Sequence, residues 1–230
     1  MIDGFIVLRQ NLLTLASAAM LLLASASVAQ SRAEDGAAPS GPSTKAPAEL
    51  GPSQLIQTTA EHIFAAIRSH PDEYRRDPSK LRGLVDRVLL PHVDSNHAVR
   101  LILGRYWREA GVDERRRFTA ALYDSILNQC GIALIDISDG RLKVFPFRGD
   151  SGSTDASVRT QVRKTDGSLV NVEYSLRWTP DGWKVWDVVI EGISYVKSMR
   201  DDVDEQIAHE GLSGVISRFE SGNAGRPDRV

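Results

Sequence analysis

The sequence predicts an α+β fold in which an antiparallel four-stranded meander sheet packs against a helical subdomain. Apolar residues recur with helical spacing over residues 53–135, and the period then changes to strict alternation over residues 142–190. Two short turns, Asp166-Gly167 and Pro180-Asp181-Gly182, join alternating segments as hairpins, so neighbouring strands run antiparallel. The apolar face of such a sheet needs a cover, and the helices supply it.

Two helices are expected first. Residue Ser53, after Pro52, is the expected N-cap of the first helix, because a serine at that position can accept a hydrogen bond from the first turn. A second helix follows Asp77-Pro78 and ends at Pro91, since proline cannot continue a helix. Their apolar stripes predict that both helices bury one face.

Two longer helices should follow before the sheet. One spans about Ser95–Glu109, with Gly111 just beyond its C-terminal end. The next is expected to be capped by Asp113 and to reach about Ile135. After the sheet, a closing helix should begin near Ser194 and stop at Gly211, before a short last helix.

The last strand differs from the others because both of its faces are apolar. Strict alternation places Trp183, Val185 and Val189 on one face with two acids, Asp187 and Glu191. The opposite face then carries three further large apolar residues, namely Trp186, Val188 and Ile190. A strand of this kind is expected to be covered on both sides.

The two ends of the chain have the composition of accessory segments. Residues 1–29 read as a signal peptide, with an apolar run before small residues and a cut after Ala29. An uncleaved membrane anchor is the alternative. Residues 30–52 form an expected flexible Ala/Pro/Ser-rich linker, residues 53–220 the folded domain, and residues 221–230 a disordered tail.

Composition argues against several classes of function. The net charge of −2 offers no basic field for nucleic acid. The single cysteine, Cys130, and the dispersed histidines give no metal-ligand pattern, and no phosphate-cradling glycine loop is found. We therefore expect no cofactor and no metal, and interpret Cys130 as a small buried apolar residue.

The acids Asp187 and Glu191 are the strongest candidates for catalysis. Four residues along a strand separate their Cα atoms by ~13 Å, which exceeds the ~5–9.5 Å of working carboxylate pairs. The sequence therefore favours structural roles, with each acid accepting hydrogen bonds from backbone N–H groups or from an arginine such as Arg200. The glycine between strand and helix, Gly192, allows the chain to turn there.

Several segments resemble the MlaC family of periplasmic phospholipid-binding proteins, also known as toluene-tolerance proteins. They are Leu84–Val93 (LVDRVLLPHV), Leu103–Trp107 (LGRYW) and Trp183–Ser194 (WKVWDVVIEGIS), followed by Arg200. The resemblance covers about residues 53–219. It implies a non-enzymatic periplasmic carrier, expected to be a monomer, that binds phospholipid in an apolar cavity between sheet and helices. Its implied partners are an outer-membrane lipoprotein complex and an inner-membrane ABC transporter.

The resemblance also suggests which residues contact lipid. The candidates are Leu103, Tyr106, Leu122, Ile126, Val172, Tyr174, Val189, Tyr195 and Met199. Each is alternatively a plain core residue, because periodicity alone does not say whether the apolar faces close on each other or leave a cavity. Substituting Val172→Trp or Leu122→Arg is expected to evict lipid and leave the fold intact.

Three alternatives to a phospholipid carrier stay open. A relative dedicated to another envelope lipid, for example a hopanoid-linked version, would have the same apolar pattern. A small α+β enzyme would use Asp187 or Glu191. A structural adaptor would have a filled core.

Overall fold

The computed structural model describes residues 50–137, 141–150, 152–163 and 167–222. The expected signal peptide with its cut after Ala29 lies outside these residues, as do nearly all of the expected linker and tail. Asp166 of the first hairpin turn and the side chain of Cys130 also lie outside them. Within the described part of the chain, no helix combines the length and apolar character that crossing a membrane requires.

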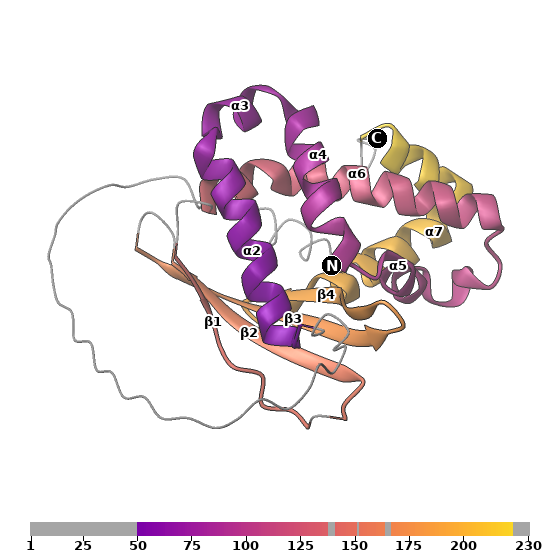
Figure 1. Cartoon of the computed structure of the whole chain (residues 1–230). Helices are drawn as coiled ribbons and strands as arrows, with labels where there is room; N and C mark the ends of the chain where they lie inside the picture. Colours follow the sequence, from indigo (N-terminus) through magenta and orange to yellow (C-terminus); the bar gives the residue numbers. More distant parts are fainter. Residues whose placement is uncertain (1–49, 138–140, 151, 164–166, 223–230) are drawn as a thin grey trace, which may run out of the picture.

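The sheet is an antiparallel meander in which each strand pairs with the next (Figure 1). Its strands are β1 (Arg141–Val144), β2 (Asp155–Arg163), β3 (Leu169–Thr179), β4 (Gly182–Ile190) and β5 (Ile193–Ser194). The expected four-stranded meander is present, and the two-residue β5 adds a fifth strand beside the end of β4. Here the chain turns back after Gly192, whose φ of 83° suits glycine.

The sheet has one face against the helices and one that is more open. Along β2, Ala156, Val158, Thr160 and Val162 are buried, while Asp155, Ser157 and Arg159 between them are exposed. The buried side packs against Leu55 and Ile56 of α2 (Pro52–Ser69). We call the face against α2 the inner face and the opposite one the outer face.

A β-bulge at Trp186 changes the faces of β4. Ser175 of β3 pairs with Asp187, but the next residue, Leu176, pairs with Val185, so that Trp186 has no partner. Beyond the bulge the alternation is reversed, so Val188 and Ile190 share the inner face with Trp183 and Val185. The prediction that Trp183 and Val185 lie on the face of Asp187 and Val189 was wrong, because strict alternation omits the extra residue.

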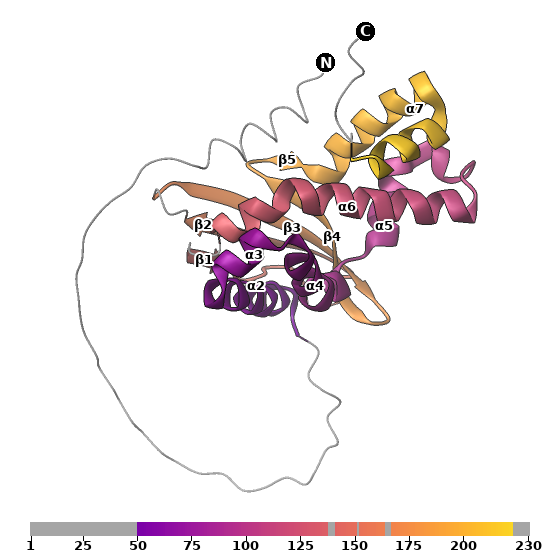
Figure 2. The same ribbon diagram turned by 90° about the horizontal axis from the view of Figure 1, so that it is seen from above.

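The helices form two groups joined by α6 (Figure 2). At one end of the molecule lie α2, α3 and α4, while α5 and α7 lie at the other, and α6 runs between them. Their bounds are α3 Pro71–Arg76, α4 Pro78–Val88, α5 Ser95–Leu103, α6 Val112–Ile137 and α7 Tyr195–Glu220, with short 3₁₀ turns at Leu90–His92 and Gly104–Trp107. Helix α3 was not expected, and the third expected helix ends early, at Gly104.

Two expected caps have other roles. The N-cap of α2 is Gly51, and Pro52 takes the first position of the helix. The hydroxyl of Ser53 donates to the carbonyl of Phe145 (3.2 Å) and accepts from the N–H of Phe147 (2.8 Å), so it ties α2 to the segment after β1. Asp113 lies inside the first turn of α6, where it pairs with Arg116 at 3.1 Å.

The described core consists of three clusters. The helical cluster joins α5, α6 and α7 around Phe118 and Val203. The second joins α2, α4 and the C-terminal part of α6 around Ile63 and Ile135. The third joins the start of α2 to the inner face of the sheet around Val158.

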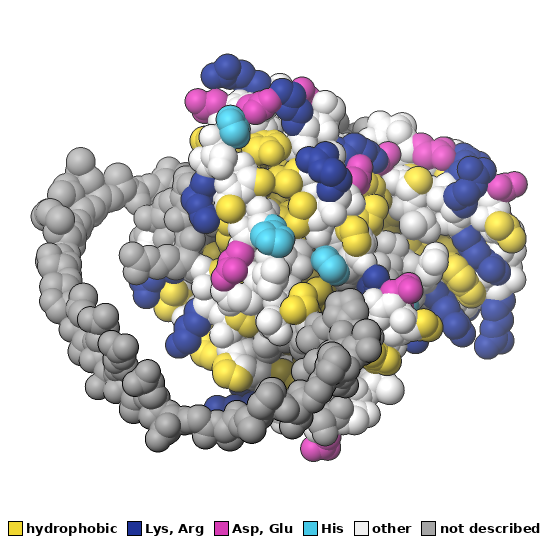
Figure 3. All heavy atoms as spheres, in the orientation of Figure 1, with side chains coloured by type: hydrophobic (Ala, Val, Ile, Leu, Met, Phe, Trp, Pro, Cys, Tyr) yellow, Lys and Arg dark blue, Asp and Glu magenta, His cyan; other side chains and the backbone are white. Residues whose placement is uncertain are grey.

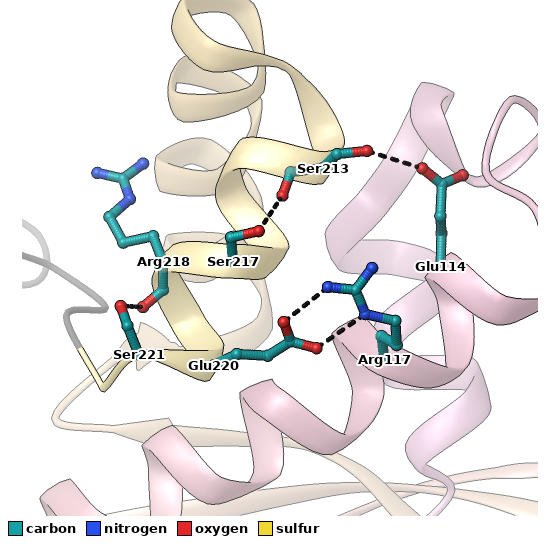
Figure 4. Close-up of polar contacts among 7 residues, drawn as sticks. All are labelled: Glu114, Arg117, Ser213, Ser217, Arg218, Glu220 and Ser221. Carbon is teal, nitrogen blue, oxygen red and sulfur yellow. Dashed lines mark hydrogen bonds and ion pairs between the residues drawn. The ribbon is translucent and has the colours of Figure 1, made fainter.

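The kink at Gly211 folds the second half of α7 back onto α6. Gly211 has φ 76° and ψ 164°, and the expected helix stop is therefore present within α7. Figure 4 shows the polar contacts that follow: Arg117 binds Glu220 through two hydrogen bonds of 2.9 and 2.7 Å, and Ser213 donates to Glu114 at 3.2 Å. Beneath them the rings of Phe118 and Phe219 lie 5.7 Å apart.

Candidate functional site

Apolar side chains of the inner face extend beyond the three clusters. Val170, Val172, Val188 and Ile190 occupy inner-face positions of β3 and β4 and are half-buried. As far as the described side chains go, none of these four belongs to a cluster. They form an apolar wall that the neighbouring cores leave partly uncovered, and we call these four residues the inner wall.

The inner wall is bordered by two buried hydroxyl groups. Thr160 is 2% exposed, and its hydroxyl donates to the carbonyl of Val172 at 2.9 Å. Burial raises the pKa of Tyr174, and a hydrogen bond with Thr160 opposes that rise. Tyr174 is therefore uncharged at neutral pH, so this border adds polar groups but no charge.

Six of the nine lipid-contact candidates lie in or against the helical cluster. Leu103, Leu122 and Met199 are at most 4% exposed inside it. The other three pack at its margin and are partly buried: Tyr106, Ile126 and Tyr195. Because Leu122 is enclosed by other core residues, Leu122→Arg would bury a charge and unfold the cluster, contrary to the expectation that the fold stays intact.

The three candidates on the sheet are divided between its two faces. Val172 and Tyr174 lie on the inner face, Tyr174 against the third cluster. Val189 pairs with Glu173, an outer-face residue, so its side chain lies on the outer face. The bulge at Trp186 causes this change, and Val189 is therefore separated from the inner wall by the sheet.

A pocket of about 340 Å³ lies on the outer face, and we call it the outer pocket. Four of its residues form one cross-strand row, Phe145, Arg159, Glu173 and Val189, one after another across the sheet. Its full lining comprises Phe145, Arg159, Thr160, Asn171, Val172, Glu173, Val189 and Gly192. The pocket thus combines apolar groups with one cation and one anion.

The outer pocket was not predicted from the sequence. Arg159 and Glu173 look like ordinary exposed residues of alternating strands. The available signal was Phe145, an aromatic residue one position past the inner-facing Val144 and hence on the outer face. Val189 gives a second such signal only once the bulge is known.

The acid Asp187 connects β4 to the start of α7. It is 6% exposed. Its Oδ1 accepts from the N–H groups of Val188 (2.8 Å) and Val196 (2.9 Å), and its Oδ2 accepts from the hydroxyl of Ser194 (2.6 Å). Ser194 in turn caps α7 by accepting from the N–H of Lys197. These bonds engage both carboxylate oxygens.

The acid Glu191 occupies a left-handed backbone position, with φ 49°. Its carboxylate accepts from the N–H of Asn171 at 2.5 Å, and its own N–H donates to the carbonyl of Asn171 at 3.0 Å. The exposed Arg200 lies elsewhere, over Gly104: a Cβ on that glycine would be 3.4 Å from its Nε. The two acids thus bind different backbone groups on different elements.

The charged side chains of the described residues form no metal centre. Among the described residues, no group of three or more His, Cys, Asp or Glu side chains could hold a metal ion. Figure 3 shows one face of the molecule, on which Lys and Arg gather over the end formed by α5, α6 and α7. Several of these cations have nearby anionic partners, as in Arg105–Asp204 and Arg117–Glu220.

Comparison with known proteins gives one family. The family model described as MlaC protein matches residues 57–221 of this chain. A toluene tolerance protein, ttg2D of Pseudomonas putida, is 25% identical over 191 residues, which cover 78% of this chain and 87% of the relative. The intermembrane phospholipid transport system binding protein MlaC of Haemophilus influenzae is 23% identical over 177 residues, covering 75% and 82%.

A solved structure has the same fold. It is the phospholipid-binding protein from Ralstonia solanacearum in complex with a phospholipid. The two structures superpose with a TM-score of 0.70 at 24% identity, covering 74% of this chain and 95% of the other. The helical and antiparallel architecture is therefore shared with that protein.

Proposed function

This chain belongs to the MlaC family, and we propose that it is a periplasmic phospholipid-binding carrier that moves lipid between the outer and inner membranes. The relatives support the proposal, because one is named as a phospholipid transport binding protein and another was solved with a phospholipid. In this proposal residues 1–29 are removed after Ala29, and the mature chain acts in the periplasm as a monomer.

The inner wall is the observation that carries the proposal. Its four aliphatic side chains are only half-buried, although they lie on the inner face of the sheet. Apolar surface left partly uncovered between three separate clusters is suited to receiving acyl chains. The uncharged border formed by Tyr174 and Thr160 is compatible with such a ligand.

The free energy of lipid transfer explains why a carrier needs such a surface. Two 16-carbon acyl chains expose roughly 30 methylene groups, and burying each one is worth about 0.8 kcal/mol. A phospholipid alone in water is therefore disfavoured by more than ~20 kcal/mol relative to a bilayer. A protein that carries it must enclose most of this surface with apolar side chains.

We further propose that the chain is not an enzyme. Asp187 and Glu191 are engaged by backbone N–H groups and by Ser194, which supports structural roles for both. The proposed protein partners are an outer-membrane lipoprotein complex and an inner-membrane ABC transporter, which would supply and accept the lipid.

Lipid extraction tests the proposal. The mature chain would be purified without detergent and its organic extract identified by mass spectrometry. We expect glycerophospholipid in near-stoichiometric amount. A hopanoid or another envelope lipid in its place would assign a different cargo, and material that carries no lipid would contradict the carrier function.

A further inference from the structure

We propose that the outer pocket is a binding site for a small zwitterion that carries a phosphate ester and an ammonium group, such as a phosphoethanolamine ester. Apart from Val172, which contributes to both linings, the site is separate from the inner wall, because the sheet separates the outer-face positions of Arg159 and Glu173 from the helices. The two charged side chains that define the site, Arg159 and Glu173, lie on the face of the sheet opposite the one proposed for acyl chains.

The pocket presents two opposite charges that do not pair with each other. Arg159 of β2 and Glu173 of β3 are directly opposed in the register. Opposite charges in such positions normally attract each other. Here the carboxylate of Glu173 instead accepts from the hydroxyl of Ser157 at 2.5 Å. Within the described residues, Arg159 forms no ion pair within 4.0 Å, so its guanidinium is available to an anion.

The wall beside these charges is held in place by a strained residue. Glu191 has φ 49° and is bonded to Asn171 through both its N–H and its carboxylate. Strained backbone of this kind often occurs beside binding sites. The carboxylate of Glu191 accepts the N–H of Asn171, and this bond holds Asn171 in position at the pocket. The side-chain oxygen of Asn171 accepts from Gln161 at 3.2 Å, which directs its amide group as a further donor.

The chemistry of the lining selects a zwitterion over a simple ion. A guanidinium binds phosphate oxygens through paired hydrogen bonds, so Arg159 is suited to the phosphate. The ammonium group of Lys143, 4.7 Å from the ring centroid of Phe145, adds positive charge on the same side. Glu173 would attract the ammonium group of the ligand but repel a ligand that carried phosphate alone.

The apolar part of the lining suits the short carbon chain between the two charges. Phe145 and Val189 stand at the two ends of the row that contains Arg159 and Glu173. The volume of about 340 Å³ lies in the range of small-ligand sites, ~300–1,000 Å³. Methylene groups between phosphate and ammonium would therefore contact apolar surface.

The test uses a soluble ligand without acyl chains. The full mature chain, labelled with ¹⁵N, would be titrated with glycerophosphoethanolamine and followed by the amide signals of Arg159, Asn171 and Gly192. We expect saturable shifts at these amides. Glycerol phosphate, which is only anionic, and ethanolamine, which is only cationic, should bind about tenfold more weakly or worse, since each lacks one of the two opposite charges and meets one unfavourable charge.

Matched variants make the test specific to the pocket. Arg159→Gln and Glu173→Gln should each weaken binding about tenfold, whereas Arg108→Gln, an exposed arginine of the helical end, should leave it unchanged. The lipid content of all three variants should equal that of the unmodified chain. Absence of saturable shifts, or equal affinity in Arg159→Gln, would overturn the proposal whatever lipid the inner face holds.

Vesicles identify the source of the zwitterion. If vesicles containing phosphatidylethanolamine retain the protein, vesicles of phosphatidylglycerol alone, whose headgroup lacks an ammonium group, retain less, and glycerophosphoethanolamine releases it, the ligand is a membrane headgroup. If the soluble compound binds but the vesicles retain nothing, the ligand is a free phosphodiester. Either result supports the site, because both require binding of the zwitterion at the same residues.

Discussion

Asp187 is the residue that most directly joins the sheet to the closing helix α7, through its carboxylate. It accepts hydrogen bonds from Val188, Val196 and Ser194, and these donors belong to β4, to the first turn of α7 and to its N-cap. A buried carboxylate in this position stabilises the turn because every donor would otherwise lose its partner.

Replacing Asp187 separates the structural role from a catalytic one. An asparagine keeps one acceptor but brings an NH₂ group toward a donor, so Asp187→Asn should lower the free energy of unfolding by about 1–3 kcal/mol. Urea denaturation measures this change, with the exposed Glu205→Gln as control, expected within about 0.5 kcal/mol of the unmodified protein. Full stability together with loss of function would contradict the structural assignment.

Asp202 of α7, unlike Asp187, has a buried carboxylate oxygen, Oδ2, that lacks a hydrogen-bond partner among the described residues. Burial raises the pKa of this carboxyl, and the neighbouring Asp201 and Glu205 raise it further. Because the folded state then binds a proton more tightly than the unfolded state, this group lowers stability as the pH rises above about 4.

Removing the charge of Asp202 should therefore stabilise the protein at neutral pH. We expect Asp202→Asn to raise the unfolding midpoint in urea at pH 7, with a smaller gain at pH 4, and by less than about 1 kcal/mol because the residue is only half-buried. Asp201→Asn, at an exposed position, should change it less. An equal gain at both pH values would refute the charge-based explanation.

At the scale of elements, Gly211 divides α7 into two helices. Its φ of 76° and ψ of 164° lie in a region that only glycine adopts without strain. Gly211→Ala should cost about 1–3 kcal/mol of stability. Gly83→Ala in α4 provides the matched control: the new methyl group meets only the mobile end of Arg87, and helix propensity favours alanine by up to ~1 kcal/mol. The melting temperatures of both variants test this prediction. Equal shifts in melting temperature would contradict the requirement for glycine at the kink.

The contact between the second half of α7 and α6 depends on apolar packing more than on its ion pair. Phe219 is 3% exposed against Phe118, so Phe219→Ala should cost about 3–5 kcal/mol. The side chains of the Arg117–Glu220 pair are close to half-exposed and screened by solvent, so Arg117→Ala should lower the unfolding midpoint much less than Phe219→Ala does. The urea midpoints of the two variants measure the difference. A midpoint for Arg117→Ala that is as low as that of Phe219→Ala, or lower, would contradict the larger contribution of apolar packing.

At the scale of the whole molecule, the sequence predicted what depends on local patterns. The period change after residue 135 lies close to the end of α6 at Ile137, and Gly211 marks the kink within α7, because such signals act within a few residues of themselves. The expected helix end at Pro91 was placed too late: α4 ends at Val88, and Pro91 lies inside the 3₁₀ turn Leu90–His92. The bulge at Trp186 has no such local mark, since it depends on how β3 and β4 align along their length. The missed bulge then placed Val189 on the wrong face.

The same limit applies to the candidate site. Apolar stripes identified Leu103, Leu122 and Met199 as buried, but their spacing could not tell a closed helical core from a lipid-contacting wall. Ser53 joined the segment after β1 instead of capping its helix, because its partners at Phe145 and Phe147 are more than 90 residues away. Long-range pairings of this kind decide which face of an element is free.

Lipid content measured in a pair of tryptophan variants tests the central claim most directly. Val172→Trp places a large ring on the inner wall, whereas Val189→Trp adds the same ring on the outer face. Native mass spectrometry of each mature protein gives the lipid bound per chain. If the inner face carries the acyl chains, Val172→Trp loses most of its lipid while folded, and Val189→Trp keeps the amount of the unmodified protein. Undiminished lipid in Val172→Trp, or loss confined to Val189→Trp, would contradict the assignment.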